Sequence, residues 1–328
     1  NLPYQSPPEL DSPILEPIEE ASGSDVPEGW SNLLLELMDD GSIDPECLVV
    51  MLHRTDPDSP STPLGWIGDG WSCRRLDGMR IGNERLEVMC YWRPAAGNPM
   101  TVVEQCESTM DEAKRLDEGG WQRVMSQSQT SGRGRGGSSW EMLEGGLACT
   151  WNLPRRCLDK HSPGLIQTAI GAAVSDVLEC LVKWPNDIVT ADGRKLGGVL
   201  IEASSEDRCI RAGIGLNQSK GNVGDEPVAG WDESIGRKSA MQVFEMLDCS
   251  ISSLFENHPL VPCVSDEDLL VLSWRALSKS LSMGADISLR GEPVRAVGLS
   301  PEGHLIVESA GEEWGVSAVG GLEWAPIL

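Results

Sequence analysis

The chain has 328 residues, which is long enough for two or three domains and a sizeable core. Its formal net charge is −25, and because so acidic a surface repels nucleic-acid phosphate we do not expect DNA binding. No apolar run approaches the length of a membrane span, so the composition argues against a membrane protein.

The cysteines and the N-terminus bear on the compartment of the protein. Ten cysteines lie singly along the chain without a Cys-x-x-Cys pair, which argues against a zinc site and predicts reduced, buried thiols. No basic segment followed by an apolar one marks a secretory signal, so we expect a cytoplasmic protein. Since the first residue is not Met, we expect the natural start to be missing or processed.

The first part of the chain carries much of the acidity. Residues 1–29 are rich in Pro, Glu, Asp and Ser and are predicted to be a disordered tail. A helical pattern then starts at Trp30 and ends at Gly41, and a second short helix is expected over residues 45–53, with Asp44 as its N-cap. Residues 66–95 look strand-like, with turns at 68–70 and 82–83, and residues 95–99 resemble a linker.

From Met100 onward, strand and helix patterns alternate. We expect strands over 101–106, 147–153, 199–203 and 210–214, and helices over 108–116, 163–181, 239–257 and 266–281. Four short β-like runs follow, over 285–289, 294–299, 304–308 and 314–319, separated by Gly, Pro and Glu turns. Their spacing predicts a small antiparallel barrel at the C-terminus.

Three glycine-punctuated segments carry positive charge in this acidic background. They read GRGR (132–135), KWPND (183–187) and RKLGG (194–198). Glycines leave backbone N–H groups open to an anion, and the cationic side chains supply the charge that such an anion needs. The plainer interpretation is solvated turns with ordinary surface charge, and for Trp184 and Pro185 it is a packing motif.

Five strings in order carry a resemblance to a known family. They are ESTMDEA (107–113), QTSGRGRGGSSW (129–140), KWPND, GRKLGGVLIE (193–202) and GIGLN (213–217). The chain therefore resembles the biotin–protein ligases. The resemblance implies an α+β fold, in which a mixed sheet with helices forms a class II synthetase-like catalytic domain and an SH3-like barrel follows.

The resemblance also implies domain boundaries. A disordered tail over 1–29 precedes an N-terminal region over 30–98, a catalytic domain over 99–265 and the C-terminal domain over 266–328. The N-terminal region resembles the winged helix-turn-helix of some ligases only faintly. Because no basic recognition helix is visible, we interpret it as a degenerate or interaction-only module.

The implied reaction has two steps. Biotin and ATP form biotinyl-5′-AMP and diphosphate, and a lysine of a biotin carboxyl carrier protein then attacks the acyl carbon. Bringing two anions together requires cations that stabilise the transition state, each by about 3–4 kcal/mol. The family pattern assigns this catalytic task to Arg133, Arg135, Lys183 and Lys195.

The remaining site residues follow from the same pattern. Those that would contact biotin are Ser108, Thr109, Gln129, Gly132, Arg133, Arg135, Lys195, Gly198, Leu200 and Gly215. Those that would contact ATP are Arg135, Trp140, Lys183, Asn186, Asp187, Lys195 and Asn217. Asp187 is the candidate ligand of Mg²⁺, which prefers oxygen ligands and phosphates.

Several of these residues have plainer interpretations. Ser108 and Thr109 also suit a helix N-cap, and Trp140 also suits a core residue. The chain departs from the family at Met110, where the usual residue is polar, and at residues 136–139, where Gly-Gly-Ser-Ser stands in place of further basic residues.

Two other functions remain open at this point. One is a lipoate–protein ligase or octanoyltransferase, which would load a different acid onto its carrier. The other is a biotin-sensing transcriptional repressor, which the acidity leads us not to expect. A homodimer is a further possibility, and no membrane partner is expected.

Overall fold

The computed structural model describes residues 28–44, 47–55, 70–81, 84–93, 100–155, 159, 161–256, 261, 263–283, 285–317 and 320–326. The predicted tail therefore lies outside the described residues up to residue 27, as do the turn at 82–83 and the linker at 95–99. Among the described helices, none is long and apolar enough to cross a membrane.

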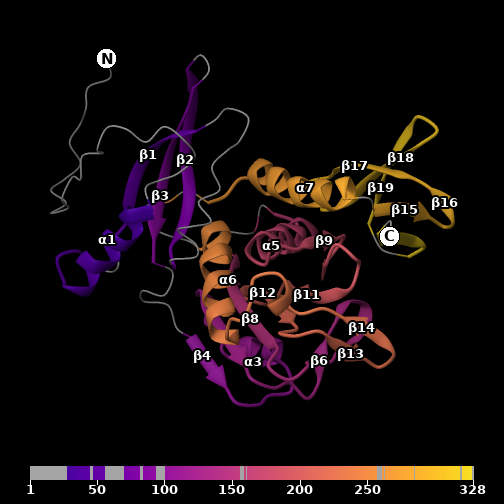
Figure 1. The fold of residues 1–328 in the computed structure, drawn as a ribbon, viewed down its shortest axis with the longest axis horizontal. Helices are drawn as coiled ribbons and strands as arrows, with labels where there is room; N and C mark the ends of the chain where they lie inside the picture. Colours follow the sequence, from indigo (N-terminus) through magenta and orange to yellow (C-terminus); the bar gives the residue numbers. More distant parts are fainter. Residues whose placement is uncertain are drawn as a thin grey trace.

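The described part of the N-terminal region contains helix α1 and an antiparallel sheet (Figure 1). Helix α1 (Glu28–Asp39) precedes β1 (Val49–Thr55), β2 (Ser72–Ile81) and β3 (Glu84–Trp92), and β3 is the middle strand. The helix predicted over residues 45–53 is wrong from Val49 onward, because β1 pairs with β3 along its whole length. Among the described residues of this region α1 is the only helix.

This N-terminal sheet packs against helix α6 (Ala240–Phe255) through a buried arginine. Arg74 of β2 donates to the carbonyl oxygens of Ser253 (2.9 Å) and Glu256 (3.1 Å), at the C-terminal end of α6. Its guanidinium also lies 5.4 Å from the centre of the Trp92 ring. A cation at this end of a helix satisfies carbonyl groups that have no partner within the helix.

The central element is a mixed sheet of nine strands (Figure 1). Its main path runs β13-β14-β11-β12-β8-β5-β4, and β10 and β9 continue from β11. The pairs β4–β5 and β11–β14 are parallel and the other pairs are antiparallel. The strands are β4 (Met100–Val103), β5 (Gln122–Ser126), β8 (Leu147–Pro154), β9 (Leu181–Lys183), β10 (Asp187–Val189), β11 (Lys195–Glu202), β12 (Cys209–Leu216), β13 (Gly221–Val223) and β14 (Glu226–Val228).

Because side chains alternate along β8, successive residues of this strand contact helices on opposite faces of the sheet. Trp151 stacks on Phe244 of α6, with ring centres 5.3 Å apart, and its indole N–H donates to Asp248. Its neighbours Thr150 and Asn152 point to the other face, where they reach α3 (Thr109–Arg115). The mixed sheet with helices on its faces confirms the predicted α+β fold of the central region, whereas the predicted C-terminal barrel is not confirmed.

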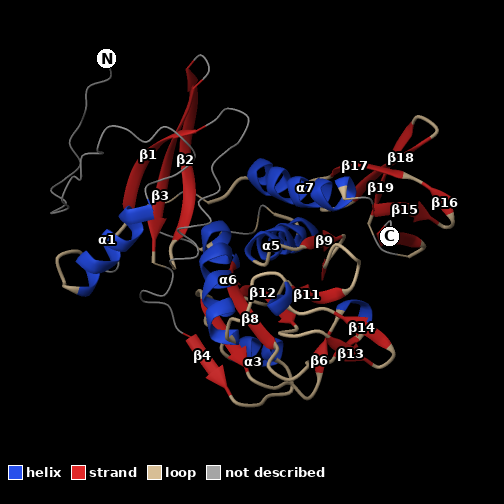
Figure 2. Cartoon of the chain, in the orientation of Figure 1, coloured by secondary structure: helices blue, strands red, loops and turns tan. Residues whose placement is uncertain are grey.

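Two further helices complete the layer on the α6 side (Figure 2). Helix α5 (Pro163–Val177) begins at the N-cap Ser162 and packs between α7 (Asp266–Ser282) and the sheet. Its small residues, Ala169, Gly171, Ala172 and Ala173, permit this close packing. The predicted helix over 163–181 is too long at its end, because Glu179 adopts a left-handed conformation and the chain turns into β9.

The C-terminal strands form two antiparallel three-stranded sheets. One contains β15 (Ala285–Leu289), β16 (Glu292–Pro293) and β20 (Leu322–Pro326), and the other contains β17 (Arg295–Leu299), β18 (Leu305–Ser309) and β19 (Glu312–Val316). The indole N–H of Trp184 donates to the carbonyl oxygen of Gly303 (3.1 Å), which joins these sheets to the turn after β9.

Candidate functional site

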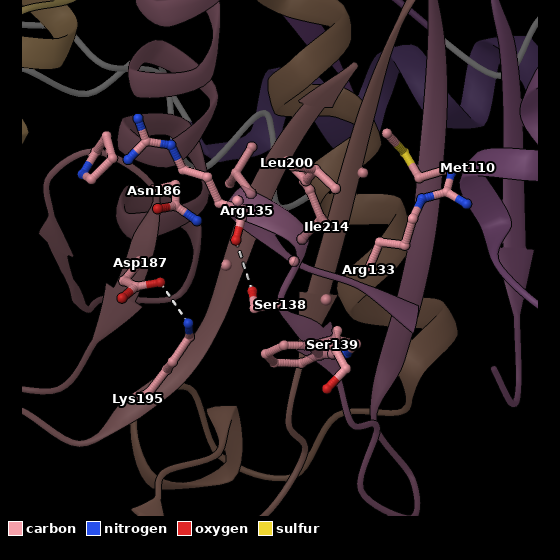
Figure 3. A pocket seen from close by; sticks show the side chains of 18 of the residues that line it. Met110, Arg133, Arg135, Ser138, Ser139, Asn186, Asp187, Lys195, Leu200 and Ile214 are labelled. Atoms are coloured by element: carbon pink, nitrogen blue, oxygen red, sulfur yellow. Dashed lines mark hydrogen bonds and ion pairs between the residues drawn. The ribbon is translucent and has the colours of Figure 1, made fainter. Parts of the chain in front are cut away.

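A pocket of about 710 Å³ lies where α3, β11, β12, the turn between β9 and β10, and the hairpin of β6 (Gly132–Arg133) and β7 (Ser139–Trp140) meet (Figure 3). Thirteen of the fifteen predicted site residues line it: Ser108, Thr109, Gln129, Arg133, Arg135, Trp140, Lys183, Asn186, Asp187, Lys195, Gly198, Leu200 and Gly215. Segments far apart in sequence thus come together at one cavity.

The two other predicted residues, Gly132 and Asn217, lie beside the pocket rather than on its lining. A Cβ at Gly132 would stand 2.5 Å from the carbonyl oxygen of Trp140, so the close approach at this glycine occurs within the hairpin. Asn217 is buried, and its backbone N–H donates to the carbonyl oxygen of Leu196 (2.9 Å). Both residues therefore contribute to the packing around the pocket and not to its lining.

One end of the pocket is a hydrogen-bond network around Gln129. The backbone N–H of Thr109 donates to Gln129 Oε1 (2.7 Å), and the hydroxyl of Thr109 donates to the same oxygen (3.1 Å). Thr150 in turn donates to Thr109 Oγ1 (2.9 Å). Because the amide oxygen is used in this way, the NH₂ group of Gln129 is the part that can donate to a bound molecule.

Ser108 has both roles that the sequence left open. It is the N-cap of α3, where its hydroxyl oxygen accepts from the backbone N–H of Met110 (3.3 Å), and it also lines the pocket. The hydroxyl hydrogen is left to donate, so Ser108 and Gln129 present donors at the same end of the cavity.

The floor of the pocket is apolar and depends on two glycines of β12. A Cβ at Gly213 would stand 2.6 Å from the sulfur of Met110, and a Cβ at Gly215 would stand 2.5 Å from the Trp140 ring. The absence of both Cβ atoms lets these two large side chains lie on the sheet. Leu200 and Ile214 complete the apolar lining.

The other side of the pocket is cationic. Lys183 and Lys195 lie there, together with Arg135 on the hairpin loop. Figure 3 shows Arg135 on the same side as Asn186, Asp187 and Lys195. Lys195 Nζ lies 2.6 Å from Asp187 Oδ1, yet the Lys195 side chain remains 43% exposed, so that it can still meet an anion in the cavity.

The two arginines of the GRGR segment differ in their surroundings. Arg133 Nη1 lies 2.6 Å from Asp111 Oδ2, and Arg133 Nε lies 3.0 Å from Glu202 Oε1. The hydrogen bond to Asp111, and then that to Glu202, raise the pKa of Arg133 above its ordinary value. Figure 3 places Arg133 beside Met110, across the pocket from Lys195.

Sequence reasoning named no pocket residue in the C-terminal region, but Leu322 and Trp324 of β20 line the cavity. They reach it because the C-terminal sheets dock beside α5, where the hydroxyl of its N-cap Ser162 donates to the carbonyl oxygen of Pro301 (3.0 Å). No local pattern marks these two residues, since their position depends on the contact between distant segments.

Residues 104–219 match the model of the biotin/lipoate A/B protein ligase family. The chain is therefore similar to that family over this ligase-family segment. The ligase-family segment contains every lining residue of the pocket except Leu322 and Trp324.

Curated relatives agree with the family match. A biotin–[acetyl-CoA-carboxylase] ligase of Paracoccus denitrificans is 31% identical over 128 residues, which cover 35% of this chain and 53% of the relative. The bifunctional ligase/repressor BirA of Bacillus subtilis is 26% identical over 212 residues, which cover 57% of this chain and 61% of that protein. The chain thus spans only about half to three fifths of the length of these two relatives.

A solved structure has a similar architecture over much of the chain. The biotin protein ligase from Aquifex aeolicus in complex with biotin and ATP has a TM-score of 0.51 and 20% sequence identity. The match covers 69% of this chain and 98% of that structure. At this identity the likeness establishes the architecture, and the chemistry has to be argued from the residues of the pocket.

Proposed function

We propose that this protein is a biotin–protein ligase, which activates biotin with ATP and transfers it to a lysine of a biotin carboxyl carrier protein. The observation that carries the proposal is the polarity of the pocket: donors at one end, an apolar floor, and cations at the other end. Biotin has the same order of groups, with a ureido carbonyl, an apolar ring and chain, and a carboxylate.

The donor end suits the ureido ring. Its carbonyl oxygen can accept from the hydroxyl of Ser108 and from the NH₂ group of Gln129, whose own oxygen is already bonded to Thr109. Met110 and Leu200 then contact the sulfur-containing ring, because both are apolar and line the floor. Dispersion and the removal of apolar surface from water favour this arrangement.

The cationic side suits the reacting groups. The biotin carboxylate attacks the α-phosphorus of ATP, the bond from that phosphorus to the bridging oxygen breaks, and diphosphate leaves. Arg135, Lys183 and Lys195 oppose the repulsion between the two anions and stabilise the charge of the transition state. Trp140 and Asn217 are the proposed contacts on the nucleotide side, with Asn217 acting from behind the lining.

Asp187 is the proposed protein ligand of Mg²⁺. Its Oδ1 atom is paired with Lys195, which leaves Oδ2 to face a cation, and ATP phosphates can supply most of the other oxygens. Among the described residues, no group of three or more His, Cys, Asp or Glu side chains could coordinate a metal ion by itself. The donor set therefore fits a metal that arrives with the nucleotide, and when bound it would neutralise phosphate charge.

The second step needs no covalent nucleophile from the enzyme. The amine of the carrier lysine attacks the acyl carbon of the adenylate, the acyl–oxygen bond breaks, and AMP leaves. The lining residues, all within the described part of the chain, include neither Cys nor His. This composition agrees with catalysis by positioning and charge rather than by an acyl-enzyme.

Incubation with ATP, Mg²⁺, labelled biotin and an apo-carrier domain tests this function. We expect ATP-dependent transfer of label to the carrier, with AMP and diphosphate as products. If the carrier is loaded from lipoate or octanoate and never from biotin, the proposal is wrong and the protein acts on linear acids. A biotin-dependent gel shift of promoter DNA, without label transfer, would instead make it a repressor.

A further inference from the structure

Arg133 is held at both ends of its guanidinium by carboxylates of different elements. Asp111 lies in the first turn of α3, directly after the residues that form the donor end of the pocket. Glu202 is the last residue of β11, and its two oxygens accept from Nε (3.0 Å) and Nη2 (3.3 Å) of Arg133. The side chain of Arg133 therefore spans from the hairpin to both a helix and a strand.

Glu202 is itself oriented from the other side. Arg211 of β12 is paired with Glu202 in the sheet register, and its Nε lies 3.8 Å from Glu202 Oε2. Arg211 is also fixed by Asp207 at 2.8 Å, and its side chain is only 4% exposed. A buried arginine thus sets the position of the carboxylate that Arg133 contacts.

The rest of the hairpin loop has little to hold it. An added Cβ at Gly136 or Gly137 would meet no atom within 4 Å, so there is open space at these two positions of the loop tip. The segment also lacks basic residues after Arg135, with Gly-Gly-Ser-Ser at 136–139. A loop of this composition cannot be closed by many contacts to a phosphate, and the pairs of Arg133 are its main charged attachment to the fold.

We propose that Arg133 is a positioning residue that fastens the hairpin loop to α3 and β11 through Asp111 and Glu202, and that this fastening retains the acyl-adenylate in the pocket. The first half of the proposal concerns the protein alone, and the second half rests on the proposed function. Arg135, which lies across the loop, is left as the arginine that meets the ligand.

Proteolysis of the ligand-free protein tests whether Arg133 holds the hairpin loop in place, and this test requires no substrate. Trypsin cleavage after Arg135 should be about three- to five-fold faster in Asp111→Asn and in Glu202→Gln than in the wild type, the effect expected for exposed ion pairs. The matched control is Glu112→Gln, which removes the same charge from the same helix but breaks a pair with Arg115 instead. Because Asp111 is half exposed, the Asp111→Asn variant is expected to fold normally. Cleavage at the wild-type rate in both test variants would overturn the proposal.

The release of biotinyl-AMP into solution, with no carrier present, tests the retention. We expect Asp111→Asn and Glu202→Gln to release adenylate about five-fold faster than the wild type while forming it at a similar rate, because each change removes one of the two carboxylates that hold Arg133. If Asp111→Asn and Glu202→Gln release adenylate at the wild-type rate while Arg133→Ala stops its formation, Arg133 is an anion ligand and the proposal is wrong. Faster trypsin cleavage in variants of a protein that forms no adenylate would support the fastening and overturn the proposed function.

Discussion

At the scale of single residues, the pocket separates two kinds of recognition. Ser108 and Gln129 present hydrogen-bond donors whose direction is set by their other partners, so the donor end is pre-organised before a ligand arrives. Lys183, Lys195 and Arg135 instead supply charge, and part of that charge is already balanced by Asp187. The two ends should therefore respond differently to substitution.

Gln129→Glu tests the donor end. The glutamate still accepts from the backbone N–H of Thr109, so α3 keeps its position, but the two donors toward the ligand are lost. We expect the KM for biotin to rise by about 10- to 100-fold, since a buried hydrogen bond left unmade costs about 1–3 kcal/mol. The KM for ATP should change much less, and Gln127→Glu, at an exposed position two residues earlier, should change neither constant.

Lys195→Ala tests the cationic side. Loss of one positioned cation should lower the rate of adenylate formation by about 10²- to 10³-fold. Transfer from externally supplied biotinyl-AMP to the carrier should be affected less, because that step starts after the anions have reacted. Lys220→Ala, at an exposed position outside the pocket, is the control; a Lys195→Ala protein with unchanged rate would remove Lys195 from the site.

At the scale of elements, the alternation of side chains between the two faces of a strand determines what each face contacts. In β12, Gly213 and Gly215 leave room beside the pocket for Met110 and Trp140. In β8, alternate residues bind α3 on one face and α6 on the other. Helix α6 then links the catalytic sheet to the N-terminal sheet, with Arg74 at its C-terminal end.

Arg74→Met tests that link. The substitution keeps much of the side-chain volume but removes the hydrogen bonds to the end of α6, each of which is charge-assisted. We expect the free energy of unfolding to fall by about 2–3 kcal/mol, measured by urea denaturation. Adenylate formation at low denaturant should remain near the wild-type rate, and an equally large loss of activity would mean that the N-terminal sheet shapes the pocket.

At the scale of the whole molecule, the site is assembled from two regions that are far apart in sequence. The C-terminal sheets approach so closely that a Cβ at Gly164 would stand 2.4 Å from the carbonyl oxygen of Glu302. This docking brings Leu322 and Trp324 to a pocket whose other walls lie between residues 108 and 215. In a chain of net charge −25, gathering cations at one cavity also creates a local attraction for an anionic ligand.

Trp324→Ala tests the contribution of the C-terminal sheets. Trp324 is buried at the pocket, whereas Trp314, on an edge strand of the other C-terminal sheet, is 38% exposed. We expect Trp324→Ala to raise a KM for biotin or ATP by about five- to 50-fold, for the loss of about 1–2 kcal/mol of apolar contact, and Trp324→Phe to recover part of it. Trp314→Ala should leave both constants unchanged; equal effects of the two alanine variants would show that the sheets act only through stability.

Local patterns in the sequence determined most elements of the catalytic domain. Helix α3 with its Ser108 cap, the β8 strand and the helices α6 and α7 have the periodicity of their final structure, because their apolar faces meet a single core. The family resemblance carried by the ordered motifs also identified thirteen residues that meet at the pocket.

Only the tertiary structure decided the features that depend on contacts between distant segments. Residues 49–55 became a strand because β3 was available to pair with them, and Leu322 and Trp324 reached the pocket because the C-terminal sheets dock beside Trp184. Likewise, Arg133 and Arg135 occupy similar places in the GRGR segment. They differ because Arg133 pairs with Asp111 and Glu202, which the packing of α3 on the sheet brings together. A local pattern records which face of an element is apolar, but the partner of that face is chosen by the whole fold.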